Sequence, residues 1–198
     1  MKLKNLEMAL QKIQGFSHPD AALEQYLTPP DLAARFLFDA YMHQDLDGLR
    51  VLDLGCGTGM LSIGAALLGA AVTGIDCDPS ALSVARGNAA LFDVPVEFSQ
   101  MRLPAESIDA FDTVVMNPPF GAQNEHADRP FIETALAAAP VVWGIFNAGS
   151  IPFIRAYTKG KAEMTAKVSA QLTIPRQFVF HTQDRLEIPV EIVRLERT

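Results

Sequence analysis

Hydrophobic positions along the chain follow two periods, one typical of amphipathic helices and one typical of buried strands. Short apolar, β-branched runs predict parallel strands at residues 50–54, 71–76, 94–98, 111–116 and 141–146. Helical spacing predicts helices at residues 3–13, 29–42, 60–68, 79–91, 130–139 and 152–161. Two alternating segments, 163–174 and 187–195, predict an antiparallel end to the sheet. The pattern indicates an α/β fold with a Rossmann-like, doubly wound, mostly parallel sheet of about seven strands and an antiparallel C-terminal strand.

Length and composition predict a single domain over residues 1–198, with a helical segment at residues 1–45 packed on it. Hydrophobic residues make up 49% of the chain and charged residues 20%, as in ordinary globular proteins. No run of about 18 apolar residues occurs and no signal-peptide core is visible, so we expect neither a membrane span nor secretion. Cys56 and Cys77 lack metal-ligand spacing, which indicates small core residues in a reducing cytoplasm and no metal site.

The charge is distributed unevenly along the chain. The formal net charge is −7, yet residues 151–198 hold 8 Lys and Arg against 5 Asp and Glu. That basic set comprises Arg155, Lys159, Lys161, Lys167, Arg176, Arg185, Arg194 and Arg197. Such an asymmetry is compatible with a phosphate-binding face on an acidic body, and equally with solvated helix and strand surfaces.

The segment before the second predicted helix carries two polar residues with two possible roles. Thr28 is a suitable N-cap and Pro29 a suitable first helical residue, since a proline there sacrifices no hydrogen bond. Gln25 and Thr28 lie at a polar hinge, where they either cap the helix or reach into a cleft.

The most informative stretch is the predicted strand that ends at Asn117-Pro118-Pro119-Phe120. The prolines have no backbone N–H, so the strand ends at Asn117, and the residue before a proline is held extended. The Asn117 amide and nearby carbonyls are thereby presented at the carboxyl end of a strand, the edge where open α/β sheets bind ligands. Next to an aromatic ring, such acceptors suit a planar group that bears an NH2; a plain strand-ending turn is the alternative.

A second motif follows the first predicted strand. Gly55, Gly57 and Gly59 form a turn that allows close backbone approach to a ligand, and Asp76 ends the next strand, where it suits ribose hydroxyls. Dinucleotide-binding folds prefer the spacing G-x-G-x-x-G. The tighter G-x-G-x-G here, preceded by Asp53, disfavours a pyrophosphate and favours a cofactor with an ammonium group. A nicotinamide oxidoreductase is therefore the weaker interpretation.

The three motifs together resemble a known family. Asp53-Leu-Gly-Cys-Gly-Thr-Gly-Met-Leu-Ser-Ile-Gly64 is similar to the cofactor loop of class I methyltransferases, which bind S-adenosylmethionine. Asn-Pro-Pro-aromatic tetrapeptides are typical of amino-methyltransferases, which act on adenine or on a glutamine amide. With Leu23-Glu-Gln-Tyr-Leu-Thr28, the chain resembles over nearly its whole length the ribosomal-RNA adenine-N6 methyltransferases of the methyltransferase-like 5 type and their archaeal relatives.

This resemblance implies roles for individual residues, and it favours the cleft over simple capping for Gln25 and Thr28. Gln25 and Thr28 would close over the cofactor, and Asp76 would hold its ribose. The complete implied cofactor set is Gln25, Thr28, Asp53, Gly55, Gly57, Thr58, Gly59, Met60, Asp76, Met101 and Asn117. The family usually places an acid after the third strand. Here Phe98-Ser-Gln-Met-Arg102 has none, so main-chain groups near Met101 would serve the adenine end.

The implied reaction is methyl transfer to the N6 nitrogen of an adenine in RNA. Asn117 and Pro118 would accept hydrogen bonds from the amine, Pro119 would stiffen the turn, and Phe120 would stack on the base. The polar loop 123–128 would gate the site, with His126 as a loop residue and not a catalyst. The resemblance also implies a small zinc-binding activator protein that pairs with the sheet edge at residues 94–98.

Two other functions compete with this one. A protein glutamine-amide methyltransferase would accept the same Asn-Pro-Pro motif, although an aromatic residue with a hydroxyl is more usual at position 120. A degenerate fold that only binds S-adenosylmethionine is the non-enzymatic alternative, and the presence of Asp53, Asp76 and Asn117 disfavours it.

Overall fold

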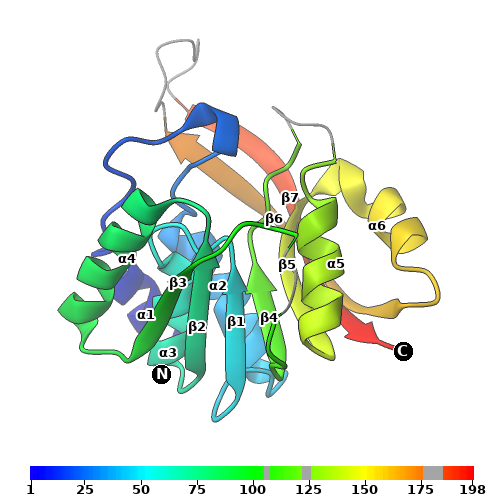
Figure 1. The fold of residues 1–198 in the computed structure, drawn as a ribbon, viewed down its shortest axis with the longest axis horizontal. Coiled ribbons are helices and arrows are strands. Elements are labelled where there is room, and N and C mark those ends of the chain that lie inside the picture. Colours follow the sequence, from blue (N-terminus) through cyan, green and yellow to red (C-terminus); the bar gives the residue numbers. More distant parts are fainter. Residues whose placement is uncertain (105–107, 122–125, 176–184) are drawn as a thin grey trace.

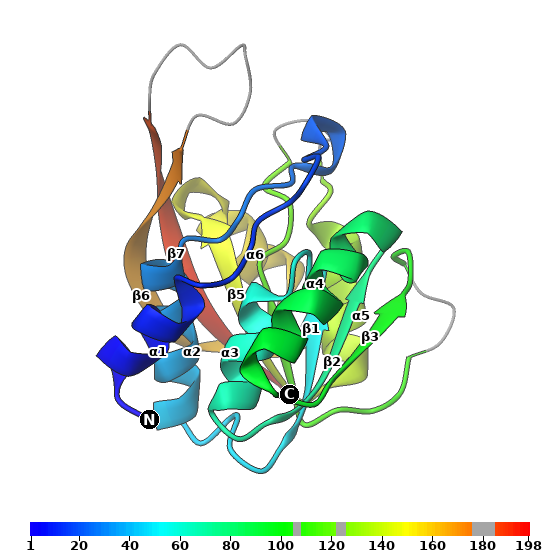
Figure 2. The same ribbon diagram turned by 90° about the vertical axis from the view of Figure 1, so that its left-hand side faces the viewer.

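The computed structural model describes residues 1–104, 108–121, 126–175 and 185–198, which form a seven-stranded sheet with helices on both faces (Figures 1 and 2). The strand order is β3-β2-β1-β4-β5-β7-β6, with β1 to β5 parallel and β7 antiparallel to both β5 and β6. The strands are β1 (Arg50–Leu54), β2 (Ala71–Asp76), β3 (Val96–Gln100), β4 (Thr113–Met116), β5 (Val141–Asn147), β6 (Ala162–Pro175) and β7 (Arg185–Arg197). The order reverses beside β1, so the predicted doubly wound fold is confirmed.

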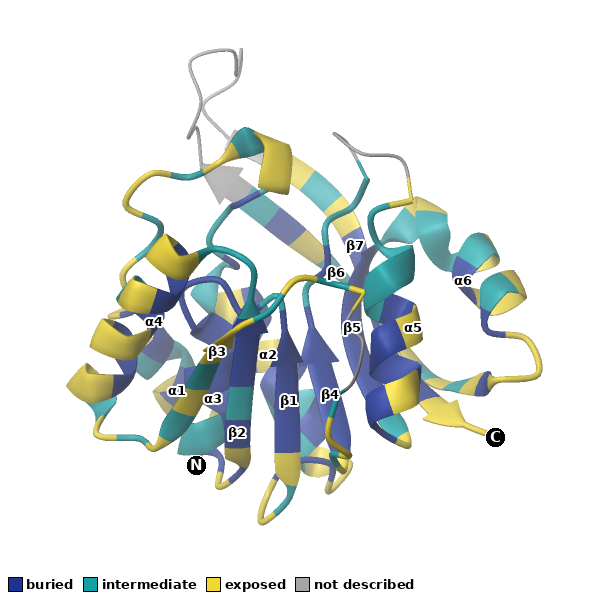
Figure 3. Ribbon diagram, viewed as in Figure 1, coloured by how far each residue is buried: buried dark blue, intermediate teal, exposed yellow. Residues whose placement is uncertain are grey.

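The helices divide between the two faces of the sheet. They are α1 (Leu3–Leu10), α2 (Pro30–Met42), α3 (Met60–Leu67), α4 (Pro79–Phe92), α5 (Arg129–Ala138) and α6 (Ile151–Tyr157), with short 3-10 turns at Ala21–Leu23 and Ala148–Ser150. One buried cluster joins α1, α2 and α3 to one face, and a second joins α5 and α6 to the other. Figure 3 shows the central strands β1, β4 and β5 mostly dark blue between these layers, because they are buried on both sides, whereas the edge strand β3 is partly exposed.

The predicted N-cap of α2 is wrong. Thr28 lies two residues before the helix, Pro29 takes the N-cap position with extended backbone (φ −55°, ψ 137°), and Pro30 is the first helical residue. The physical reason is the second proline, because Pro30 disfavours helical geometry at Pro29. The side chain of Thr28 is therefore not used as a cap.

Other predicted boundaries shift by a few residues. The third strand begins at Val96 instead of Val94, and the fourth begins at Thr113 instead of Phe111. Helix α1 ends at Leu10, three residues before Ile13. The helix predicted at 152–161 spans only Ile151–Tyr157, and the last strand continues to Arg197. The third strand nonetheless lies at an edge of the sheet, as expected.

The N-terminal segment is fastened to the parallel half of the sheet by a buried amide. Asn88 of α4 is 2% exposed, and its side chain bonds both main-chain groups of Gln14 at 3.0 Å. The same Nδ2 donates to the carbonyl of Thr58 at 2.9 Å. This junction fixes the start of the segment that runs over the carboxyl edge of the sheet.

A second junction ties α2 to the C-terminal hairpin. Asp45 accepts hydrogen bonds from the indole of Trp143 at 2.7 Å and from Arg194 at 2.8 Å. Because the carboxylate is buried, removing Arg194 would leave its charge without compensation, whereas removing the indole would cost one hydrogen bond. Within the described part of the chain, no helix is long and apolar enough to cross a membrane.

Candidate functional site

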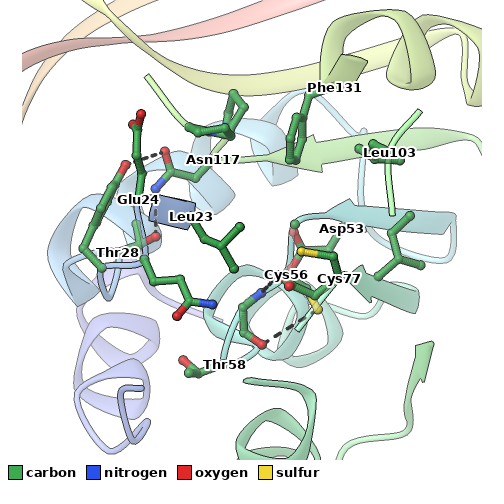
Figure 4. A pocket seen from close by; sticks show the side chains of 18 of the residues that line it. Leu23, Glu24, Thr28, Asp53, Cys56, Thr58, Cys77, Leu103, Asn117 and Phe131 are labelled. Atoms are coloured by element: carbon green, nitrogen blue, oxygen red, sulfur yellow. Dashed lines mark hydrogen bonds between the residues drawn. The ribbon is translucent and has the colours of Figure 1, made fainter. Parts of the chain in front are cut away.

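The carboxyl ends of β1, β2 and β4 meet at a cavity of about 250 Å³, which the segment 16–28 covers (Figure 4). These three strands are neighbours in the sheet, so residues that follow them come together although they are distant in sequence. Figure 4 shows Thr28, Asn117 and Glu24 on one side of the cavity and Cys56, Cys77 and Asp53 on the other. The cavity therefore has a floor of strand ends and a cover of N-terminal chain.

The glycine loop of the floor has a backbone that other residues adopt only under strain. Gly55, Gly57 and Gly59 have φ values of 70°, 53° and 89°. A Cβ on Gly55 would lie 2.8 Å from Cε1 of Phe131, and one on Gly57 would lie 2.9 Å from Cζ of Phe16. The first two glycines line the cavity, whereas Gly59 forms the N-cap of α3 and does not.

Asp53 is a buried carboxylate with one satisfied oxygen. Its side chain is 1% exposed, and Oδ2 accepts a hydrogen bond of 2.5 Å from the Ser62 hydroxyl. Oδ1 has no hydrogen-bond partner among the described residues. Burial raises the pKa of Asp53 to about 7, against the opposing effect of the Ser62 hydrogen bond, and nearby Asp76 adds to the rise. A buried acceptor without a donor, next to a cavity, is suited to a cationic ligand group.

Asp76 is held rigidly at the end of β2. Its two oxygens accept backbone N–H groups of Gly57 at 2.8 Å and Asp78 at 2.9 Å. Each carboxylate oxygen keeps a further lone-pair direction, so the group can also accept ligand hydroxyls. The strand end beside it places Met101, Arg102 and Leu103 along the cavity wall.

Asn117 is clamped from the cover. Its Nδ2 donates to the Thr28 hydroxyl at 3.0 Å, and its Oδ1 accepts a hydrogen bond of 3.3 Å from the Tyr26 hydroxyl. Desolvation raises the pKa of Tyr26, so this hydroxyl keeps its proton and remains a donor. The two contacts fix which way the amide points, and the second lone pair of Oδ1 remains for a ligand amine.

Two further contacts hold the cover onto the floor. The Gln25 amide donates to Asp78 at 2.8 Å and accepts from the backbone of Asp20 at 2.8 Å. The Glu24 carboxylate accepts the backbone N–H of Phe120 at 2.7 Å, while Glu24 itself has a left-handed backbone (φ 51°). Such a conformation is unusual for a non-glycine residue and clusters at functional sites.

Most residues predicted for the site line the cavity. These are Gln25, Thr28, Asp53, Gly55, Gly57, Thr58, Met60, Asp76, Met101, Asn117, Pro118 and Pro119. Gly59 and Phe120 do not. The Phe120 ring instead packs against Tyr26, with ring centroids 6.2 Å apart, and against the core cluster that holds α1, α2 and α3.

Sequence reasoning missed several members of the cavity, chiefly Phe16, Glu24, Tyr26 and Phe131. Tyr26 stands inside the Leu23–Thr28 stretch, so its position between Gln25 and Thr28 was an available signal. Phe131 had none, because its contact with Gly55 depends on the packing of α5. Of the predicted gating loop, residues 123–125 lie outside the described part of the chain, as does Arg176 of the basic set.

Comparison with known proteins decides the family. A family model described as the methyltransferase small domain matches residues 28–142. The rRNA N(6)-adenosine-methyltransferase METTL5 of Danio rerio is 35% identical, over 100% of both chains. This chain belongs to that family of methyltransferases.

Structural comparison agrees with this membership. The methyltransferase superposes on a crystal structure of a candidate RNA methyltransferase of Pyrococcus horikoshii with a TM-score of 0.93 and 37% identity. The match covers 100% of this chain and 98% of that one. A release factor glutamine methyltransferase of Deinococcus radiodurans is 48% identical, but only over 36% of this chain and 26% of that protein.

The cofactor of a methyltransferase of this class is S-adenosylmethionine, and the cavity residues fit it. The unpartnered oxygen of Asp53 suits the ammonium of its methionine part, and the carboxylate of Asp76 suits the hydroxyls of its ribose. The backbone turn at Gly55 and Gly57 leaves room that a Cβ would fill. Asp53 and Asp76 would repel an anionic pyrophosphate at this position, so the cavity disfavours a dinucleotide.

Proposed function

We propose that this methyltransferase transfers a methyl group to the exocyclic N6 nitrogen of an adenine in RNA, and that the RNA is ribosomal. The observation that carries the proposal is the clamped Asn117 amide in the wall of the cofactor cavity. The full-length match to relatives that bear the name rRNA N(6)-adenosine-methyltransferase supports the choice of substrate. We place the reaction in the cytoplasm and treat residues 1–198 as one domain, with residues 1–45 packed on it.

In this proposal the protein acts by orienting the amine. Asn117 Oδ1 and the Pro118 carbonyl accept the two N–H groups of the adenine, so the nitrogen lone pair is turned toward the methyl donor. S-adenosylmethionine held at Asp53 and Asp76 would supply an electrophilic methyl group for that nitrogen and would leave as the neutral thioether. The methylated nitrogen would then give up a proton to water. No strong base is required, because the proton becomes acidic only once the nitrogen is alkylated.

The clamp determines which atom of the Asn117 amide can accept a hydrogen bond from the substrate. With Tyr26 donating to Oδ1 and Thr28 accepting from Nδ2, the Asn117 oxygen is the atom presented to a ligand. Aromatic stacking on Phe120 stays a prediction that requires the Phe120 ring to turn away from Tyr26. The target adenine must be unstacked, which fits a loop or junction of folded RNA.

The decisive experiment combines labelled cofactor with two substrates. Purified protein, tritiated S-adenosylmethionine and ribosomal RNA from a strain that lacks the gene should yield label that ribonuclease removes. Nucleoside mass spectrometry should identify the product as N6-methyladenosine. Label that survives ribonuclease but is removed by protease would identify the glutamine-amide reaction instead, and cofactor binding without any transfer would indicate a binding module.

We also propose that a small zinc-binding activator protein adds a strand to β3. Support comes from the position of β3 at the end of the sheet, where its outer ladder is open to another chain. Native purification from the source cells, followed by zinc analysis, should recover the partner with wild-type protein. Replacing Glu97 of β3 by proline should remove it, whereas the same recovery with both proteins would contradict the β3 site.

A further inference from the structure

A ladder of rings and cations leads away from the cavity, on the face of the sheet opposite α1, α2 and α3. It runs from the start of α5, which borders the cavity, to Lys161, which lies at the amino end of β5. Its members are His126, Arg129, Phe153, Tyr157 and Lys161, and we call it the α6 ladder. Figure 1 shows α6 next to α5, near the carboxyl edge of the parallel strands. None of these residues takes part in the site described above.

The rings are ordered as a stack. Phe153 and Tyr157, four residues apart on α6, have ring centroids 5.2 Å apart at an interplanar angle of 27°. His126 continues the stack on Phe153, at 6.5 Å and 24°. Buried Ile154 anchors α6 in the core, while Phe153 and Tyr157 stay half-exposed. Core packing therefore covers these two rings only in part.

Cations lie over the same rings. The Arg129 guanidinium is 5.2 Å from the centre of Phe153 and 5.7 Å from the centre of Tyr157, and the Lys161 ammonium is 5.3 Å from the Tyr157 ring. Nε of Arg129 is buried without a hydrogen-bond acceptor in the described chain. Residues 126–161 contain four Lys and Arg against two Asp and Glu, although the whole chain has a net charge of −7.

One end of the ladder adjoins the cofactor cavity. Ala127 and the first turn of α5, at Pro130 and Phe131, line the cavity, and Arg129 stands between them in sequence. A nucleic acid with its target base in the cavity would pass this surface with the adjoining nucleotides. Rings interleaved with Arg and Lys are the surface on which unpaired bases stack, while the cations meet phosphates.

We propose that the α6 ladder binds the single-stranded RNA next to the target adenine, with a base stacked at Tyr157 and phosphates at Arg129 and Lys161. The Tyr157 face covered by Lys161 is the accessible one, because a lysine side chain moves at little cost and its ammonium can turn to a phosphate. The proposal rests on the proposed function for its substrate class, but it concerns binding and not transfer.

The test measures binding by fluorescence anisotropy with a 12-nucleotide single-stranded RNA that contains one adenine, and with the same sequence as a duplex. Tyr157→Leu keeps apolar bulk and removes the ring; it should weaken single-strand binding about tenfold and duplex binding much less. Tyr157→Phe is the matched control, because it keeps the ring and loses only the hydroxyl that bonds Glu133, so its affinity should equal wild type.

Charge provides a second arm that keeps every ring of the ladder. Lys161→Glu should weaken binding and make its dependence on salt shallower, whereas Lys12→Glu, on the exposed end of the N-terminal helical segment, should change affinity far less. The RNA-binding role of the α6 ladder would be contradicted if Tyr157→Leu bound the single strand as tightly as wild type. It would also be contradicted if Tyr157→Phe lost as much affinity as Tyr157→Leu. Absence of single-strand binding by the wild-type protein would contradict it as well.

The outcomes separate this inference from the proposed function. If Tyr157→Leu and Lys161→Glu methylate RNA with an unchanged KM for RNA, the proposed function is supported and the RNA-binding role of the α6 ladder is contradicted. If these variants bind RNA more weakly but the label goes only to protein, the RNA-binding role of the α6 ladder is supported and the proposed reaction is contradicted. Cofactor affinity should stay at the wild-type value in every variant, which shows that the fold is intact.

Discussion

The floor and the cover of the cavity are built in different ways. The floor consists of strand ends and a glycine turn, where backbone geometry and burial on both faces of the sheet fix each group. The cover, residues 16–28, has a single short 3-10 turn. Side-chain hydrogen bonds attach it to the floor: Gln25 and Tyr26 donate, and Glu24 and Thr28 accept. A site that must admit cofactor and substrate needs one wall that is rigid and one that can open, and polar contacts of this kind are individually modest.

The largest effect should come from the residue where floor and cover meet. Asn117→Ala removes the acceptor for the adenine amine, and we expect the transfer rate to fall at least about 100-fold, as for other preorganised polar groups. Affinity for S-adenosylmethionine, measured by calorimetry, should stay within about threefold of wild type, because Asp53 and Asp76 are unchanged. Near-normal turnover by this variant would contradict the mechanism.

The next effect comes from the glycine turn of the floor, at the point where it meets the cover. Gly57→Ala places a Cβ 2.9 Å from Cζ of Phe16 at a φ of 53°, so the turn must move. We expect cofactor affinity to fall about tenfold or more, with a destabilisation of about 1 kcal/mol.

Gly87→Ala is the matched control for that substitution. Gly87 lies within α4, its φ is not positive, and a Cβ there would meet nothing within 4 Å. Because alanine restricts the unfolded chain and favours helix, this variant should gain about 0.4–1 kcal/mol in stability and keep wild-type affinity. Equal affinity in both variants would show that the glycine turn is not a cradle.

The sequence predicted the floor better than the cover, and the reason is physical. Strand ends are marked by local signals, such as the two prolines after Asn117 and the glycines after Leu54, so their neighbours in the sheet follow from α/β topology. The cover has no regular pattern. The contact of Gln25 with Asp78 spans 53 residues, and that of Tyr26 with Asn117 spans 91, so neither leaves a local trace in the sequence.

Proline chemistry also explains the one wrong cap. A helix start at Thr28-Pro29 is reasonable for a single proline, but a second proline moves the start by one residue and releases Thr28 to Asn117. Thr28 is therefore a part of the site and does not cap α2.

A pH dependence should report on Asp53 in the floor. Its pKa of about 7 in the folded protein is raised from the ordinary value of 3.8, so the folded state binds more protons than the unfolded state between these values. Stability of the free protein should therefore decrease as pH rises through that window. A cationic ligand group requires the ionised carboxylate, so affinity for S-adenosylmethionine should increase up to about tenfold per unit of pH below 7.

Asp53→Asn tests that assignment, because the amide does not titrate. This variant should bind the cofactor weakly, and the part of the pH dependence that belongs to Asp53 should disappear. The cofactor's own amine titrates identically with both proteins, so the comparison isolates the carboxylate. The same increase in affinity with pH in Asp53→Asn and wild type would assign the titration to another group.

The smallest expected effect isolates one contact of the cover. Tyr26→Phe removes the hydroxyl that bonds Asn117 Oδ1 and keeps the ring beside Phe120, so the cavity retains its shape. The amide then has only Thr28 to set its direction, and we expect kcat to fall about three- to tenfold, equivalent to about 1 kcal/mol for one hydrogen bond. The KM for S-adenosylmethionine should not change.

Tyr41→Phe on α2, outside the cavity, serves as the control and should leave kcat at the wild-type value. A rise in KM with constant kcat would instead mean that Tyr26 acts on cofactor binding and does not set the direction of the Asn117 amide.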